Sequence, residues 1–175
     1  MGLFDFFKKK NNEEQQKHEP VRPKQADNVV DEAQQEFIND STANAERIVE
    51  SFNEKYEGAF DYSEESLVAL DELLENFVDF GDQMDDEMKE DLIAQAGSYI
   101  FEVARRNFGG KYFWYDQLDQ PLLVTGLPNF EISLVAFDKV KMRLENGQED
   151  NIPYFFKGYS DRVRLAKPGD KAMIV

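Results

Sequence analysis

The chain has 175 residues, a formal net charge of −16 and no cysteine. This length predicts one domain that can fold without a disulfide or a structural metal. The absence of cysteine excludes a disulfide framework, thiolate zinc sites and cysteine nucleophiles. No apolar run approaches the roughly 18 residues of a membrane span, and no secretory signal is seen. We therefore expect a cytoplasmic protein.

The negative charge is concentrated in one stretch of the chain. Residues 27–96 carry 22 acidic and three basic residues, a net charge of −19, whereas the flanking segments are close to neutral. A surface of this kind repels phosphate backbones, so we expect no nucleic-acid binding. It attracts basic proteins and accelerates their encounter with the chain. A surface that serves only solubility is the alternative.

The N-terminal segment differs from the rest, and we predict a mobile tail or linker over residues 1–26 and a single acidic domain over residues 27–175. Residues 11–26 are polar and contain two prolines, so burial cannot offset the entropy of ordering them. The tail opens with a short amphipathic stretch of apolar and basic residues, Leu3, Phe4, Phe6, Phe7, Lys8, Lys9 and Lys10. This stretch fits weak binding to an anionic membrane at its inner face. A disordered start, or a docking peptide for another protein, is the alternative.

Apolar periodicity predicts three amphipathic helices in the acidic stretch, over residues 27–56, 63–81 and 85–107. We expect the first helix to break near Asp40-Ser41. Ser63 is predicted to cap the second helix and Gly81 to end it. Gly109-Gly110 is predicted to end the third helix, because glycine readily adopts the left-handed conformation found there.

The chain changes character after residue 110. Aromatic and β-branched residues predict three short strands, over residues 111–115, 121–125 and 130–132. A helix should follow with four residues on its apolar face, Leu134, Phe137, Val140 and Leu144. Asp150 or Asn151 is expected to cap a last helix, with Pro153 in its first turn, before a final strand over residues 172–175. Helices, then a small antiparallel sheet and two C-terminal helices predict an α+β fold.

The sequence contains no recognisable catalytic arrangement, and we expect no enzymatic activity. It has no Gly-x-Ser-x-Gly elbow, and its one histidine, His18, lies in the predicted tail. Carboxylates between residues 82 and 91 lack the spacing of a calcium loop. They suit the positive end of a helix dipole, so we expect neither a metal ion nor another cofactor. Four of them are candidates for a partner-binding surface, Asp85, Asp86, Glu87 and Glu90.

The most patterned stretch runs from Gly97 to Trp114. Gly97 costs a helix about 1 kcal/mol relative to alanine, which predicts a close approach by another element. Five residues are candidates for a partly buried polar network, Tyr99, Glu102, Arg105, Arg106 and Trp114. Such a network can fix the helix against the sheet. The alternative is a groove for a small ligand or substrate.

The motif Gly97-x-Tyr99-x-x-Glu102-Val103-x-Arg105-Arg106-x-x-Gly109-Gly110, followed by Trp114, resembles a signature in small bacterial domains of unknown function. In those domains, as in this chain, an acidic helical segment precedes the motif. A Leu-Glu-Asn-Gly-x-Glu-Asp segment follows it, matching residues 144–150. The resemblance covers roughly residues 62–163. It implies a bacterial origin and a single domain, and it implies no activity, cofactor or catalytic residue.

The sequence is compatible with three functions. The first is a non-enzymatic domain whose acidic surface binds a basic protein, in the manner of an immunity protein or antitoxin by analogy only. The second is a peripheral membrane adaptor held by residues 2–10. The third is a ligand binder or enzyme that uses a groove beside Tyr99, Glu102 and Arg105.

Overall fold

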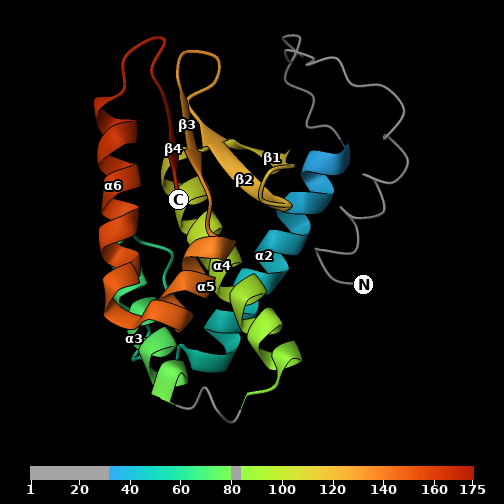
Figure 1. Ribbon diagram of the computed structural model, residues 1–175, viewed down its shortest axis with the longest axis vertical. Coiled ribbons are helices and arrows are strands. Elements are labelled where there is room, and N and C mark those ends of the chain that lie inside the picture. The colour runs from blue at the N-terminus through green and yellow to red at the C-terminus, as the bar shows by residue number, and fades with distance from the viewer. Residues whose placement is uncertain (1–31, 80–83) are drawn as a thin grey trace.

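A computed structural model describes residues 32–79 and 84–175 of the chain (Figure 1). Helices α2 (Glu32–Phe52), α3 (Ser66–Asp79) and α4 (Asp86–Phe108) precede strands β1 (Lys111–Tyr115), β2 (Gln120–Thr125) and β3 (Glu131–Leu134). Helix α5 (Phe137–Asn146), the 3-10 helix η2 (Gly147–Asp150), helix α6 (Ile152–Leu165) and strand β4 (Lys171–Ile174) complete the fold. The fold is α+β, as the sequence predicts. Among the described helices, none has the length and apolar character required to cross a bilayer.

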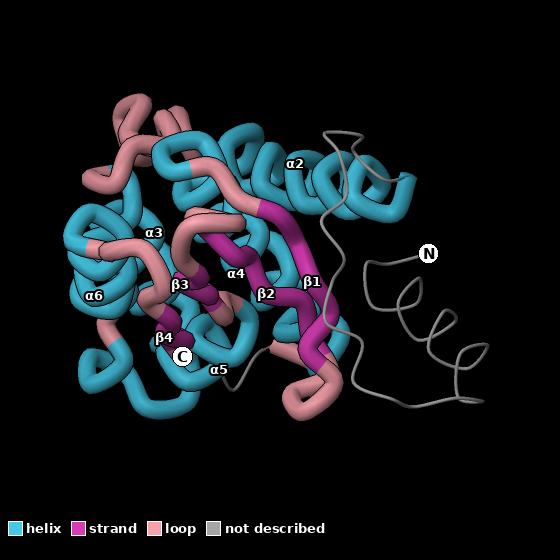
Figure 2. The backbone as a smooth tube through the Cα atoms, turned by 90° about the horizontal axis from the view of Figure 1, so that it is seen from above, coloured by secondary structure: helices cyan, strands magenta, loops and turns pink. Residues whose placement is uncertain are grey.

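The four strands form one sheet in the order β1-β2-β3-β4. Neighbouring strands are antiparallel from β1 to β3, whereas β4 runs parallel to β3. The parallel pair follows from the connection, because the chain passes through α5, η2 and α6 before it returns to the sheet. The sheet is therefore mostly antiparallel, and helices α4 and α6 both contact it (Figure 2).

The first predicted helix is wrong in one respect, because α2 continues through Asp40-Ser41 without a break. Ser41 is buried one turn from Phe37 and Ala45, on the face of α2 that packs inward. Its hydroxyl lies 3.3 Å from the Tyr112 hydroxyl, so this polar group has a partner inside the core. The helix also ends earlier than predicted, at Phe52, and its predicted start at residue 27 lies outside the described residues.

The caps predicted at Ser63 and Gly109 are confirmed, and the structure adds one at Asp85 that the sequence analysis did not name. Helix α3 begins three residues after Ser63, and the Ser63 hydroxyl accepts a hydrogen bond from the Ser66 amide at 3.2 Å. Asp85 caps α4 by accepting from the Met88 amide at 2.8 Å. Gly109 ends α4 with φ 74°, in the left-handed region that favours glycine. The predicted stop at Gly81 lies outside the described residues.

Leu134 was expected on the apolar face of a helix, and that prediction is wrong. It is the last residue of β3, where it lies opposite Leu123 of β2 and Ile174 of β4. Its burial in the sheet leaves Phe137 as the first residue of α5. The last helix begins as predicted, since the Asn151 side chain accepts from the Tyr154 amide at 2.9 Å.

The close approach predicted at Gly97 is made by α5. A Cβ atom placed on Gly97 would lie 2.0 Å from Cδ1 of Phe137, which is far inside van der Waals contact. The missing side chain therefore allows the Phe137 ring to pack directly on the α4 backbone. This contact joins the helical layer to the segment that follows the sheet.

Candidate functional site

The Glu102 carboxylate is the centre of the predicted polar network. Its side chain has no exposed surface, and it accepts hydrogen bonds from Arg105 Nε and Nη2, both at 2.8 Å. Arg106 Nε donates a third bond at 3.0 Å. The two arginine side chains retain 28% and 38% of their surface. The hydrogen bond from Arg105 to Glu102 raises the pKa of Arg105 above its ordinary value.

Tyr62 links this cluster to Tyr99. The Arg106 guanidinium carbon lies 3.6 Å from the centre of the Tyr62 ring, close enough for a cation–π contact. On the other side, the Tyr62 and Tyr99 rings stack at 4.9 Å. The Tyr99 hydroxyl accepts from the Tyr62 amide at 3.1 Å and donates to Ser66 Oγ at 2.8 Å. Burial raises the pKa of Tyr99, so the phenol stays neutral over the physiological range.

These contacts indicate a structural joint between α4 and the segment before α3. Glu102 and Tyr99 are fully buried, and their polar atoms bond to neighbouring protein groups. Trp114 lies on β1 opposite Pro121 and takes no part in the contacts just described. An open hollow of about 350 Å³ lies elsewhere on the surface, lined by Lys55, Tyr56, Glu57, Ala59, Glu65, Val68, Ala69 and Glu72. None of the five predicted network residues lines that hollow.

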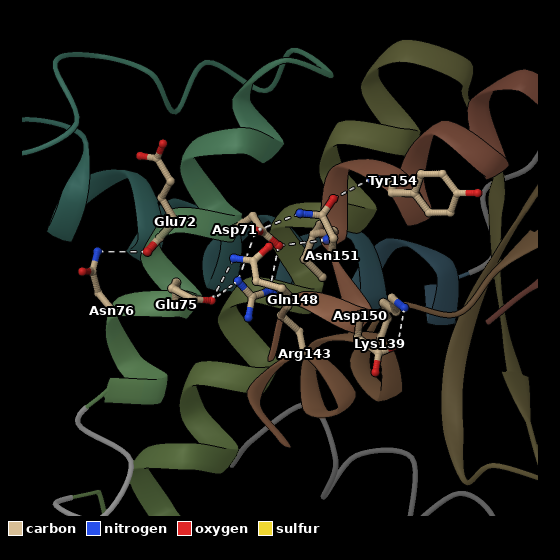
Figure 3. A network of polar contacts seen from close by, with 11 residues as sticks. Asp71, Glu72, Glu75, Asn76, Lys139, Arg143, Gln148, Asp150, Asn151 and Tyr154 are labelled. Atoms are coloured by element: carbon tan, nitrogen blue, oxygen red, sulfur yellow. Dashed lines mark hydrogen bonds and ion pairs between the residues drawn. The ribbon is translucent and has the colours of Figure 1, made fainter. Parts of the chain in front are cut away.

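A second buried ion cluster, centred on Arg143, was missed by the sequence analysis (Figure 3). Arg143 of α5 has no exposed surface and donates to both carboxylate oxygens of Asp71, at 2.9 and 3.2 Å. It also pairs with Glu75, one turn further along α3. Asp71 accepts two more bonds, from the Ile152 amide at 2.9 Å and from Asn151 Nδ2 at 3.1 Å.

This cluster ties α3, α5 and the start of α6 together. Burial by itself lowers the pKa of Arg143, but its bonds to Asp71 and Glu75 outweigh that effect and raise the pKa. The sequence did carry a signal. Asp71 lies between Leu67 and Leu74 at helical spacing, so a charged residue occupies the apolar face of a helix.

Most of the described carboxylates of the acidic stretch are exposed to solvent, Asp71 being buried. Helix α2, the N-cap of α4 and the first half of α4 carry ten exposed acidic residues, Glu32, Glu36, Asp40, Glu46, Glu50, Asp85, Asp86, Glu87, Glu90 and Asp91. Within residues 32–79 and 84–175, no ion pair includes any of these ten. The two helices pack on each other, so their outer sides belong to one region of the molecule (Figure 1). We call these ten residues the acidic surface.

The remaining predicted sites are not placed by the structure. The membrane-contact candidates Leu3 to Lys10 lie outside the described residues, as does the boundary at residue 26. In the described part of the chain, no group of three or more side chains is arranged to hold a metal ion.

Comparisons with protein-family models, with curated proteins and with solved structures found no match to this chain. The resemblance to small bacterial domains therefore stays a prediction.

Proposed function

We propose that this chain is a non-enzymatic interaction domain, and that its acidic surface binds a basic protein. The observation that carries the proposal is the set of ten exposed carboxylates without an ion pair among the described residues. Some surface carboxylates elsewhere are paired, as Glu64 is with Arg164 and Glu131 with Lys171. Others, such as Asp116 and Glu145, form no ion pair among the described residues, so the ten are distinguished by their number on two helices that pack together.

Uncompensated carboxylates repel one another, and this repulsion opposes the compact state. Arg47 and Lys89 are the basic residues of α2 and α4 that lie among them, and neither forms an ion pair in the described part of the chain. A basic partner relieves the repulsion when it binds. Complementary charge of this kind mainly accelerates association and selects the partner.

The test is affinity capture from the native cytoplasm, followed by association kinetics with each basic protein recovered. Raising the salt concentration should slow association about 10- to 100-fold, because charges further apart than about 8 Å are screened at physiological ionic strength. Dissociation should change less, since it depends on close contacts.

Charge variants decide whether the acidic surface itself binds. The test variant carries Asp85→Asn, Asp86→Asn, Glu87→Gln and Glu90→Gln. Its control removes the same number of exposed carboxylates elsewhere, with Asp116→Asn, Asp119→Asn, Glu145→Gln and Glu149→Gln. We expect the first variant to lose the partner and the control to keep it. An acidic partner, or equal loss in both variants, contradicts the proposal.

A further inference from the structure

The sheet has a second apolar face, directed away from the main core. Side chains alternate along a strand, so Tyr112, Leu123 and Leu134 point into the main core and their neighbours point outward. Six apolar residues lie on the outward side, on the four strands or directly after them: Phe113, Leu122, Val124, Val135, Met173 and Val175. The same side also carries Lys111, Ser133 and the ion pair of Glu131 with Lys171. We call the six apolar residues the outer sheet face.

The apolar residues of this face are exposed at its two edge strands and buried between them. Phe113, Met173 and Val175 expose 37%, 41% and 57% of their surface. Leu122, Val124 and Val135 are buried and form a cluster separate from the main core. Among the described residues, the partly buried apolar side chain packed against this cluster is Tyr115, and no helix supplies one. Exposed apolar side chains that adjoin a buried apolar cluster are a place where an apolar segment can dock.

We propose that the N-terminal segment Leu3–Lys10 of this same chain docks on the outer sheet face. Four of the five residues from Leu3 to Phe7 are apolar, and three lysines follow them directly. The turn between β1 and β2, at one end of the face, exposes the carboxylates of Asp116 and Asp119. Apolar residues therefore meet an apolar face, and a basic run meets an acidic turn.

The point where the described chain begins supports this occupant. Gln34 bonds to the edge strand β1: its Oε1 accepts from the Tyr112 amide at 2.9 Å, and its Nε2 donates to the Tyr112 carbonyl. The described chain therefore begins beside the edge of the sheet. Residues 11–31 form a tether with a root-mean-square reach of about 25 Å if they behave as a flexible chain. That reach exceeds the width of a four-stranded sheet, about 15 Å.

The tether also favours this chain's own segment over competing occupants. A short flexible linker gives the segment an effective concentration in the millimolar range, above that of a second copy at ordinary protein concentrations. Anionic lipid would be repelled by Asp116 and Asp119 at the end of the face. Docking would sequester the aromatic side chains of the segment, which otherwise suit a membrane surface.

The test uses the full chain with a spin label on a single introduced cysteine, Asn11→Cys, since the protein has no cysteine of its own. Methionine methyl groups report the position of the label by nuclear magnetic resonance. Met173 lies on the outer sheet face, whereas Met88 lies on α4 and is similarly exposed, at 51% compared with 41%. We expect the Met173 signal to lose most of its intensity and the Met88 signal to keep it.

Variants and mixtures distinguish the occupants. Phe4→Ser, Phe6→Ser and Phe7→Ser together should restore the Met173 signal, whereas Val21→Ser in the tether should not. Oxidation of Met173 by peroxide should also accelerate in the triple variant, relative to Met88. An unchanged Met173 signal overturns the proposal. So does broadening that appears only when spin-labelled chains are mixed with separate, isotope-labelled chains, because it would come from a second copy. Recovery of the Met173 signal on adding vesicles with anionic lipid, with binding of the chain to them, supports a segment that exchanges between face and membrane. Binding to vesicles without any prior broadening of Met173 counts against docking.

Discussion

Replacing Asp71 by asparagine should cost more stability than any other removal of a single carboxylate charge from this protein. The substitution removes the charge that faces Arg143, whose side chain has no exposed surface. Asparagine keeps one acceptor oxygen, but its amide group faces donors from Arg143 and Asn151. Glu75 remains as a partner for Arg143, with 43% of its side chain exposed. Breaking a buried ion pair on one side costs about 3–5 kcal/mol, and we expect a value in that range.

Glu102→Gln provides the comparison, because this carboxylate is also fully buried but its partners are not. Arg105 and Arg106 expose 28% and 38% of their side chains and can turn toward water when the charge is removed. The loss should then be about 1–3 kcal/mol, the cost of charge-assisted hydrogen bonds and of one poorly satisfied buried group. Glu145→Gln, on the exposed side of α5, should stay within about 0.5 kcal/mol of the parent.

The assay is urea unfolding at neutral pH, with the three variants and the parent measured at equal protein concentration. The midpoints give the differences in unfolding free energy, provided that the slope with urea stays constant. If Glu102→Gln costs as much as Asp71→Asn, then exposure of the cationic partner does not set the penalty. A loss below about 1 kcal/mol for Asp71→Asn would show that Arg143 reaches solvent after a small rearrangement, and the reasoning would be wrong.

Three further outcomes can be measured on the same protein. Gly97→Ala should destabilise it by about 1–3 kcal/mol in urea, despite the higher helix propensity of alanine, because the new methyl group overlaps the Phe137 ring. Burial raises the pKa of Tyr159 to about 12, whereas the pKa of tyrosine in the unfolded chain is near 10. The folded chain therefore keeps this proton at a higher pH than the unfolded chain does, and the unfolding free energy should fall between about pH 10 and 12. The fall should be smaller in Tyr159→Phe. The hydrogen bond from Lys139 lowers the pKa of Asp150, so its contribution to stability is present above the unfolded pKa near 3.9 and is lost as the pH falls through the folded value. Asp150→Asn should therefore flatten the acid side of the stability profile, and an unchanged acid profile would contradict that assignment.

The sequence predictions were right mainly for local features, which depend on residues close together in the chain. The bounds of α4 could be predicted from Asp85 and Gly109, since a cap bonds to a backbone amide or carbonyl within the same turn. The strand β1 was predicted from five consecutive residues, four of them aromatic. The close approach at Gly97 was predicted from its cost to the helix, although the sequence did not show that Phe137 makes the contact.

Contacts between distant residues were decided by the tertiary structure. Ser41 does not break α2 because Tyr112, 71 residues further along, lies against its hydroxyl. Leu134 belongs to a strand because Leu123 and Ile174 come to lie on either side of it. A periodic pattern shows which side of a helix or strand faces inward, but it carries no information about which residue of another element lies opposite.

The candidate sites divide in the same way. Glu102, Arg105 and Arg106 were predicted to belong to one network, because residues three and four apart share one side of a helix. The pairing of Asp71 with Arg143, 72 residues apart, was not predicted, and its strength depends on burial that only the packing of α3, α5 and α6 creates. By itself the sequence determined which residues carry charge and which side of each element is apolar. The tertiary structure decided which charges lose contact with water, because an ion is desolvated only when side chains from several elements close around it.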